Sequence, residues 1–165
     1  DIFNNHTDRV KMANIAQVVN VLQAMILTKD EKIILTPTYH VFEMYKEHQK
    51  AQNIPLYFNS PQYVYNQQAI NAVSCTLSKN ANGKYHLTVS NLDTRNTQAI
   101  ELPLGDLKIS KVTNTRILTS KNAADYNSFD KPETIKPTEF KGTTVKQGAL
   151  KIVLPQLSVV ALELE

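Results

Sequence analysis

Three amide side chains near the start of the chain have a spacing suited to binding a neutral polyol. Asn14, Gln17 and Asn20 recur every third residue, which would place them on one face of a helix or of a tight helical loop. Amides suit sugars because they offer hydrogen-bond donors and acceptors without charge. The same side chains could instead cap turns and satisfy nearby backbone groups, and spacing alone leaves both interpretations open.

Two predicted elements would position these amides. Residues 9–13 are typical of a short β-strand, and residues 15–27 are almost continuously apolar with the i, i+3, i+4, i+7 spacing of a helix. A strand that leads into an amide-bearing loop is how an α/β barrel builds a polyol-binding rim. Thr36 and Pro37 predict the start of a further helix, as N-cap and first helical residue, and Pro55 predicts its end.

The rest of the chain has the pattern of short β-strands. Asn82-Gly83 is a strong hairpin signal because both residues accept positive φ, and residues 120–137 read as a polar loop. Such strands with regular turn signals indicate a mainly β fold, a jelly-roll-like antiparallel β-sandwich. The expected strands and extended segments are 69–77, 84–91, 98–102, 108–119, 138–145, 149–154 and 157–164.

Two segments carry a resemblance to a known family. DRVKMANIAQVVNVLQAMILT and ILTPTYHVFEMYKEHQ resemble the C-terminal part of the α-L-arabinofuranosidases of glycoside hydrolase family 51. The resemblance implies that residues 1–54 are the C-terminal end of a (β/α)8 catalytic barrel and that residues 55–165 form an antiparallel β-sandwich. It also implies that Arg9 to Asn14 is the last barrel strand and that Gln17 contacts arabinose.

The resemblance further implies what the parent protein does. Such an enzyme removes terminal α-L-arabinofuranosyl residues from arabinose-containing polysaccharides and oligosaccharides by retaining hydrolysis, with two glutamates in Asn-Glu and Glu-Trp contexts. This chain contains no Trp, and no Glu follows an Asn. We therefore expect no catalytic residue here, Gln17 as the single substrate-binding residue, and an isolated chain that is inactive.

An alternative role is a non-catalytic β-sandwich module that binds carbohydrate or a protein partner. Tyr57, Phe58, Tyr63 and Tyr65 could form an aromatic sugar platform, although their place at the predicted domain junction favours packing between domains. Without barrel neighbours, the apolar side chains of residues 1–30 would face water. We expect this segment to pack on the sandwich, to pair with another copy in a homo-oligomer, or to be disordered.

Composition excludes several other classes. The net charge is only +3 and the 18 basic residues are scattered, which argues against a nucleic-acid or membrane surface. No apolar run is long enough to span a membrane. A single cysteine, Cys75, and four histidines without a metal-binding spacing predict neither a metal nor another cofactor. We expect Cys75 to be a buried, inert thiol and His48 to be a surface or interdomain contact, while the cellular compartment stays open.

Overall fold

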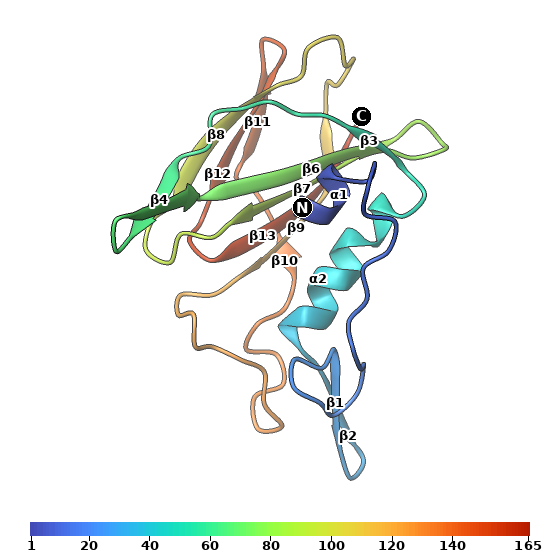
Figure 1. The fold of residues 1–165 in the computed structure, drawn as a ribbon, viewed down its shortest axis with the longest axis vertical. Coiled ribbons are helices and arrows are strands. Elements are labelled where there is room, and N and C mark those ends of the chain that lie inside the picture. Colours follow the sequence, from blue (N-terminus) through green and yellow to red (C-terminus); the bar gives the residue numbers. More distant parts are fainter.

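Antiparallel sheets make up most of the structure, a computed structural model that describes residues 1–165 (Figure 1). The predicted mainly β, sandwich-like fold is confirmed. The larger sheet has six strands, which in spatial order are β10 (Thr138–Glu139), β9 (Val112–Thr119), β13 (Ser158–Leu164), β7 (Tyr85–Asn91), β6 (Val73–Lys79) and β3 (Gln52–Ile54). The smaller sheet has three, which in order are β11 (Thr143–Lys146), β12 (Ala149–Leu154) and β8 (Gln98–Pro103).

The core lies between these two sheets. Alternate residues of β12 point inward, and Leu150, Ile152 and Leu154 are completely buried. They belong to one cluster with residues of the larger sheet such as Leu87 and Val160. The period of two in the sequence therefore identified the inward faces of these strands correctly.

The predicted hairpin around Gly83 joins β6 to β7. Gly83 has a φ of +83°, and the Asn80 side-chain oxygen accepts hydrogen bonds from the backbone N–H groups of Asn82 and Lys84 at 2.9 and 3.0 Å. Residues 120–137 contain no strand or helix, as predicted. The expected strand 69–77 is instead split by a bend into β5 and β6. β5 (Gln68–Asn71) pairs with β4 (Gln62–Tyr65) in a separate two-stranded ribbon.

The helix predicted to begin after Thr36 forms, but it is shorter than expected. α2 (Pro37–Tyr45) continues into the 3₁₀ turn η1 (Lys46–His48). The expected end near Pro55 is wrong because Gln52–Ile54 already form β3, which pairs with β6 at the edge of the larger sheet. The Thr36 hydroxyl does not cap the helix, since it donates a hydrogen bond to the carbonyl oxygen of Ala24 at 2.7 Å. No helix is long and apolar enough to cross a membrane.

The strand predicted at residues 9–13 and the helix predicted at 15–27 do not form. A short helix, α1 (Ile2–Asn5), is followed by an irregular segment, and then by the hairpin of β1 (Ile26–Lys29) and β2 (Lys32–Leu35). A strand needs a neighbour to pair its backbone groups, and no strand of this chain lies beside residues 9–13. Several apolar side chains here face solvent, and Leu22 is 94% exposed.

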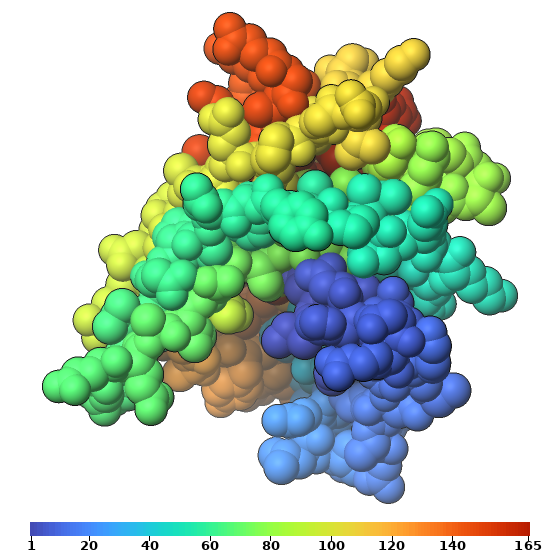
Figure 2. All heavy atoms as spheres, turned by 45° about the horizontal axis from the view of Figure 1, so that its top comes forward, coloured from blue at the N-terminus to red at the C-terminus, as the bar shows by residue number.

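The N-terminal segment nevertheless packs on the sandwich. In Figure 1, α1 lies against β6 and α2 runs along the outer face of the larger sheet. Figure 2 shows the first residues, in dark blue, gathered on one face of the molecule beside the teal segment that follows η1. Of the three outcomes expected for residues 1–30, packing on the sandwich is therefore the one observed for α1.

Candidate functional site

Gln17 lies in the irregular segment between α1 and β1. Its side chain is exposed, and no hydrogen bond within the chain occupies its amide. A free primary amide on an exposed loop can both donate to and accept from a sugar hydroxyl. The structure therefore leaves Gln17 available for a ligand.

The other two amides are used differently, so the three do not share a helix face. Asn20 has a φ of +55°, and its side chain exchanges two hydrogen bonds with Thr28, both at 2.8 Å. Asn14 is exposed and lines an apolar groove. Of the two interpretations that the spacing left open, hydrogen bonding to nearby groups of the chain applies to the Asn20 amide but not to the Gln17 amide.

Hydrogen bonds from outside the loop hold its C-terminal side. Ala24 is buried, and its carbonyl oxygen accepts the Thr36 hydroxyl. The buried Asn127, in the long polar loop, donates to the carbonyl oxygen of Leu35 at 2.8 Å. It also exchanges two hydrogen bonds with the backbone of Ile135, at 2.9 and 2.7 Å. The hairpin that follows the Gln17 loop is thereby joined to the polar loop of the sandwich.

An open groove of about 480 Å³ lies between the N-terminal segment and α2. Gln17 does not line it. Phe3 and Phe42, which do, are both more than two-fifths exposed. An apolar surface of this kind is typical of packing against another part of a protein rather than of a sugar site. Its lining residues are Asp1, Phe3, Asn4, Ala13, Asn14, Ile15, Val41, Phe42 and Tyr45.

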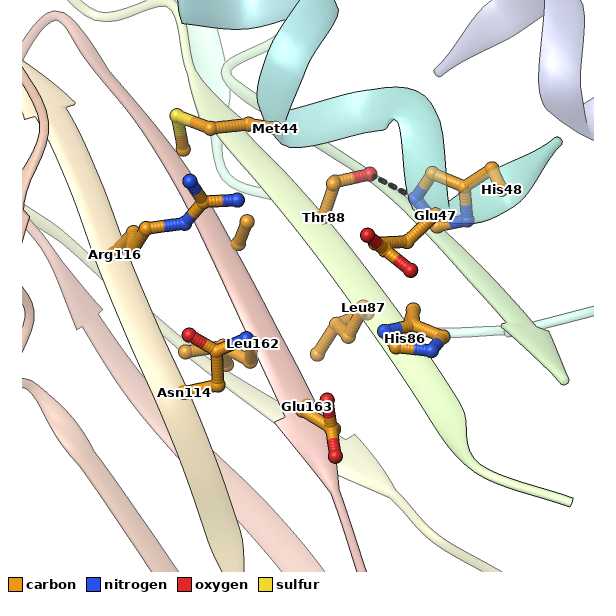
Figure 3. Close-up of a pocket in the computed structure, with 11 residues that line it drawn as sticks. Met44, Glu47, His48, His86, Leu87, Thr88, Asn114, Arg116, Leu162 and Glu163 are labelled. Atoms are coloured by element: carbon orange, nitrogen blue, oxygen red, sulfur yellow. Dashed lines mark hydrogen bonds between the residues drawn. The ribbon is translucent and has the colours of Figure 1, made fainter. Parts of the chain in front are cut away.

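A second pocket, beneath η1, is polar but very small (Figure 3). Its volume of about 20 Å³ has room for one water molecule and not for a sugar ring. Arg116 at its edge forms an ion pair with Glu43 at 2.6 Å. The Arg116 Nε is buried without a partner, which is a donor that a single water could satisfy.

His48 joins η1 to the larger sheet beside this pocket. Its Nδ1 lies 2.7 Å from the Ser78 hydroxyl and its Nε2 lies 3.0 Å from the Thr88 hydroxyl, the second contact being drawn in Figure 3. Burial, with a smaller contribution from His86, lowers the pKa of His48 to about 4. His48 is therefore a neutral contact between the predicted barrel end and the sandwich.

Two acidic side chains of the sandwich are paired with lysines, and its single thiol is buried. Glu163 is bound by Lys84, and Glu101 by Lys151 at 3.2 Å. The predicted burial of Cys75 is confirmed, and this burial raises the pKa of its thiol to about 12. No group of three or more His, Cys, Asp or Glu side chains is arranged to hold a metal ion.

The four aromatic side chains of the connector do not form one platform. Tyr57 is 84% exposed and Tyr65 is also exposed, whereas Phe58 and Tyr63 pack against the core. Tyr57 and Phe58 both line an open polar groove, together with Asn59, Asn71 and Glu101.

Sequence reasoning missed one buried polar cluster, centred on Asp1. The Asp1 carboxylate accepts hydrogen bonds from hydroxyl groups of α2, β6 and β7. The available signal was the alternation of hydroxyl residues in the two strands, Ser74-x-Thr76-x-Ser78 and Thr88-x-Ser90. Such alternation is typical of a solvent-facing surface, but Thr76, Ser78 and Thr88 are buried. Thr76 and Thr88 contact Asp1, and Ser78 contacts His48.

Comparison with known proteins identifies the family. Residues 1–158 match the family model described as the α-L-arabinofuranosidase C-terminal domain. The chain belongs to this family. A curated member from Bacteroides ovatus, described as an intracellular exo-α-L-arabinofuranosidase, is 48% identical over 166 residues, which cover 100% of this chain and 32% of that protein. The chain thus spans about a third of this relative.

Solved structures of arabinofuranosidases agree with this assignment. The GH51 arabinofuranosidase from Xanthomonas axonopodis pv. citri superposes with a TM-score of 0.95 at 41% identity, over 100% of this chain and 33% of that one. The family 51 enzyme from Bifidobacterium longum superposes with a TM-score of 0.84 over 97% of this chain and 32% of that one. Because its identity is 21%, it supports the fold of the C-terminal domain alone.

Proposed function

We propose that this chain is the C-terminal domain of an exo-acting α-L-arabinofuranosidase. The parent enzyme would remove terminal α-L-arabinofuranosyl residues from arabinose-containing polysaccharides and oligosaccharides by retaining hydrolysis. The observation that carries the proposal is the 48% identity over the whole chain to a relative described as an exo-α-L-arabinofuranosidase. The catalytic carboxylates would lie in the part of the enzyme outside this sequence.

The chain would supply two things to that enzyme. Residues 55–165, together with the edge strand β3 that pairs with β6, would form the accessory sandwich, and the rest of residues 1–54 would be the end of the catalytic barrel. Gln17 is the substrate-binding residue, and its free, exposed amide on a loop tied to the rest of the chain supports this role. The exposed apolar side chains of the same segment, such as Met12 and Leu22, would be covered by the preceding barrel elements.

A second candidate function is supported by the groove beside Tyr57. A solvent-facing aromatic ring next to amide and carboxylate side chains is a combination that can stack on and hydrogen-bond to a sugar. On this reading the sandwich is a non-catalytic module that holds a glycan chain. It differs from the first function because it needs no part of the barrel.

The two functions are separated by assaying the purified 165-residue chain. We expect no turnover of an aryl α-L-arabinofuranoside above the buffer rate, while a full-length protein containing the chain is active on the same substrate. Turnover by the chain alone would contradict the first function. Calorimetry with arabinan or arabinoxylan oligosaccharides tests the second, because binding by the chain with a millimolar or lower Kd would favour the module.

A further inference from the structure

Five hydroxyl groups hold the carboxylate of Asp1 against the sandwich. Its Oδ1 accepts hydrogen bonds from Tyr45, Thr76 and Thr88 at 2.9, 2.9 and 3.2 Å. Its Oδ2 accepts from Ser74 and Ser90 at 2.7 and 3.2 Å. We call this set of residues the Asp1 clamp, and it consists of Asp1, Tyr45, Ser74, Thr76, Thr88 and Ser90.

The partners of the Asp1 carboxylate are hydroxyl groups rather than cationic side chains. None of the side-chain ion pairs of the chain includes the Asp1 carboxylate, and its hydrogen-bond partners within the chain are the five hydroxyl groups. Hydrogen bonds to an ionised acceptor are stronger than those between neutral groups. Because the donors come from α2, β6 and β7, the clamp fixes Asp1 relative to three elements at once.

His48 extends the clamp and fixes the direction of its hydrogen bonds. When the Thr88 hydroxyl donates to Asp1, its oxygen is free to accept from His48 Nε2–H. His48 Nδ1 then accepts from the Ser78 hydroxyl. A neutral imidazole has this arrangement of one donor and one acceptor.

A second contact holds α1 at the edge of the same sheet. β3 pairs with β6 only from Leu77 to Lys79, so the backbone of β6 before Leu77 has no strand beside it on that side. The Asn5 side chain donates to the carbonyl oxygen of Cys75 at 2.8 Å. Asp1 and Asn5 therefore hold α1 on both the face and the edge of β6.

We propose that Asp1 is a positioning residue for the substrate-binding loop, because the clamp fixes α1 and the loop that carries Gln17 follows α1 directly. This inference rests on the proposed function. The loop has little regular structure of its own, so the place of Gln17 depends on how its two ends are held. Thr36 and Asn127 hold the C-terminal end, and the Asp1 clamp holds the N-terminal end.

The test uses full-length enzyme containing the chain. In Asp1→Ala, kcat/KM for an aryl α-L-arabinofuranoside should fall about tenfold, because small displacements of a positioning group are costly. Asp8→Ala is the matched control, since Asp8 is an exposed carboxylate of the same segment and should keep the wild-type value. Wild-type kcat/KM in Asp1→Ala would overturn the proposal.

A double-mutant cycle separates positioning from general stability. If Asp1 acts through Gln17, adding Asp1→Ala to a Gln17→Ala enzyme should cause little further loss of kcat/KM. If the loss of kcat/KM in the double variant equals the product of the losses in the two single variants, Asp1 does not act through Gln17. That result would overturn the proposal even if Asp1→Ala also lowers Tm. Asp1→Asn, which keeps one acceptor oxygen, should fall between Asp1→Ala and the wild type, and it serves if Asp1→Ala does not fold.

A separate readout keeps this inference distinct from the proposed function. Wild-type kinetics in Gln17→Ala would contradict the role of Gln17 in substrate binding. Amide hydrogen exchange would then test separately whether the Asp1 clamp holds this segment in place. Exchange of residues 6–25 should then be faster in the Asp1 variant than in the wild type and in Asp8→Ala. Unchanged exchange would show that Asp1 does not hold this segment.

Discussion

His48 shows how a single side chain links the two parts of the chain. The ring bridges hydroxyl groups on β6 and β7, and burial lowers its pKa to about 4. A protonated ring would have two donors and no acceptor, so it could no longer accept from Ser78. The contact therefore depends on the imidazole being neutral.

We predict that this contact weakens in mild acid. The pKa of His48 is about 4 in the folded state and 6.5 for an unperturbed histidine, so the unfolded chain binds the proton more tightly. The contribution of His48 is fully present above about pH 6.5 and is lost as the pH falls to about 4, with a total change of no more than about 4 kcal/mol.

Urea unfolding at a series of pH values measures this contribution. The stability difference between the wild type and His48→Gln should shrink as the pH falls from about 6.5 to about 4. His6→Gln supplies the control, because the exposed His6 ring makes no side-chain hydrogen bond. A difference that is constant with pH, or that grows in acid, would contradict the assignment.

At the scale of elements, a glycine is required at position 142, between β10 and β11, because two backbone segments approach each other closely there. A Cβ atom there would lie 2.5 Å from the carbonyl oxygen of Val153 and 2.6 Å from the Phe140 ring. The Gly142 carbonyl oxygen accepts the Val153 N–H at 2.8 Å. Val153 belongs to β12, which is paired on both sides, so its backbone cannot easily move away.

Gly142→Ala should therefore lower the free energy of unfolding by about 2 to 3 kcal/mol. Gly105→Ala is a matched comparison, because Gly105 has a φ of +54° but open space around it, and we expect a loss of about 1 kcal/mol from backbone strain alone. Urea denaturation of both variants measures the two values. An equal or smaller loss in Gly142→Ala would mean that β10, β11 and β12 can separate without cost.

The strands were predictable from sequence because their signals are local. Alternating apolar residues marked β12 and β13, and Asn82-Gly83 marked the hairpin between β6 and β7. The apolar run at 15–27 was misread as a helix because a helical spacing of apolar residues predicts burial of one helix face, and many of these residues are exposed in the structure. The Asp1 clamp could not be predicted because it joins residues more than 70 positions apart.

The whole molecule is a sandwich carrying an extension whose apolar surface it covers only in part. α1, α2 and η1 pack on the larger sheet, while Met12 and Leu22, in the same segment as Gln17, remain exposed. The chain spans about a third of its 48% identical relative, and under the proposed function the remainder of the enzyme would cover these apolar side chains. Of the proposed site, only Gln17 was predicted from the sequence, through the family resemblance. The helix face that Asn14, Gln17 and Asn20 were expected to share does not form.

The most direct test is a crystal structure of the full-length protein bound to arabinose. The account predicts that the Gln17 side chain forms a hydrogen bond of about 2.7 to 3.2 Å with a sugar hydroxyl, and that the residues that attack and protonate the glycosidic bond lie outside this chain. Arabinose bound in the active site with Gln17 beyond hydrogen-bonding reach, directly or through one water molecule, would contradict it.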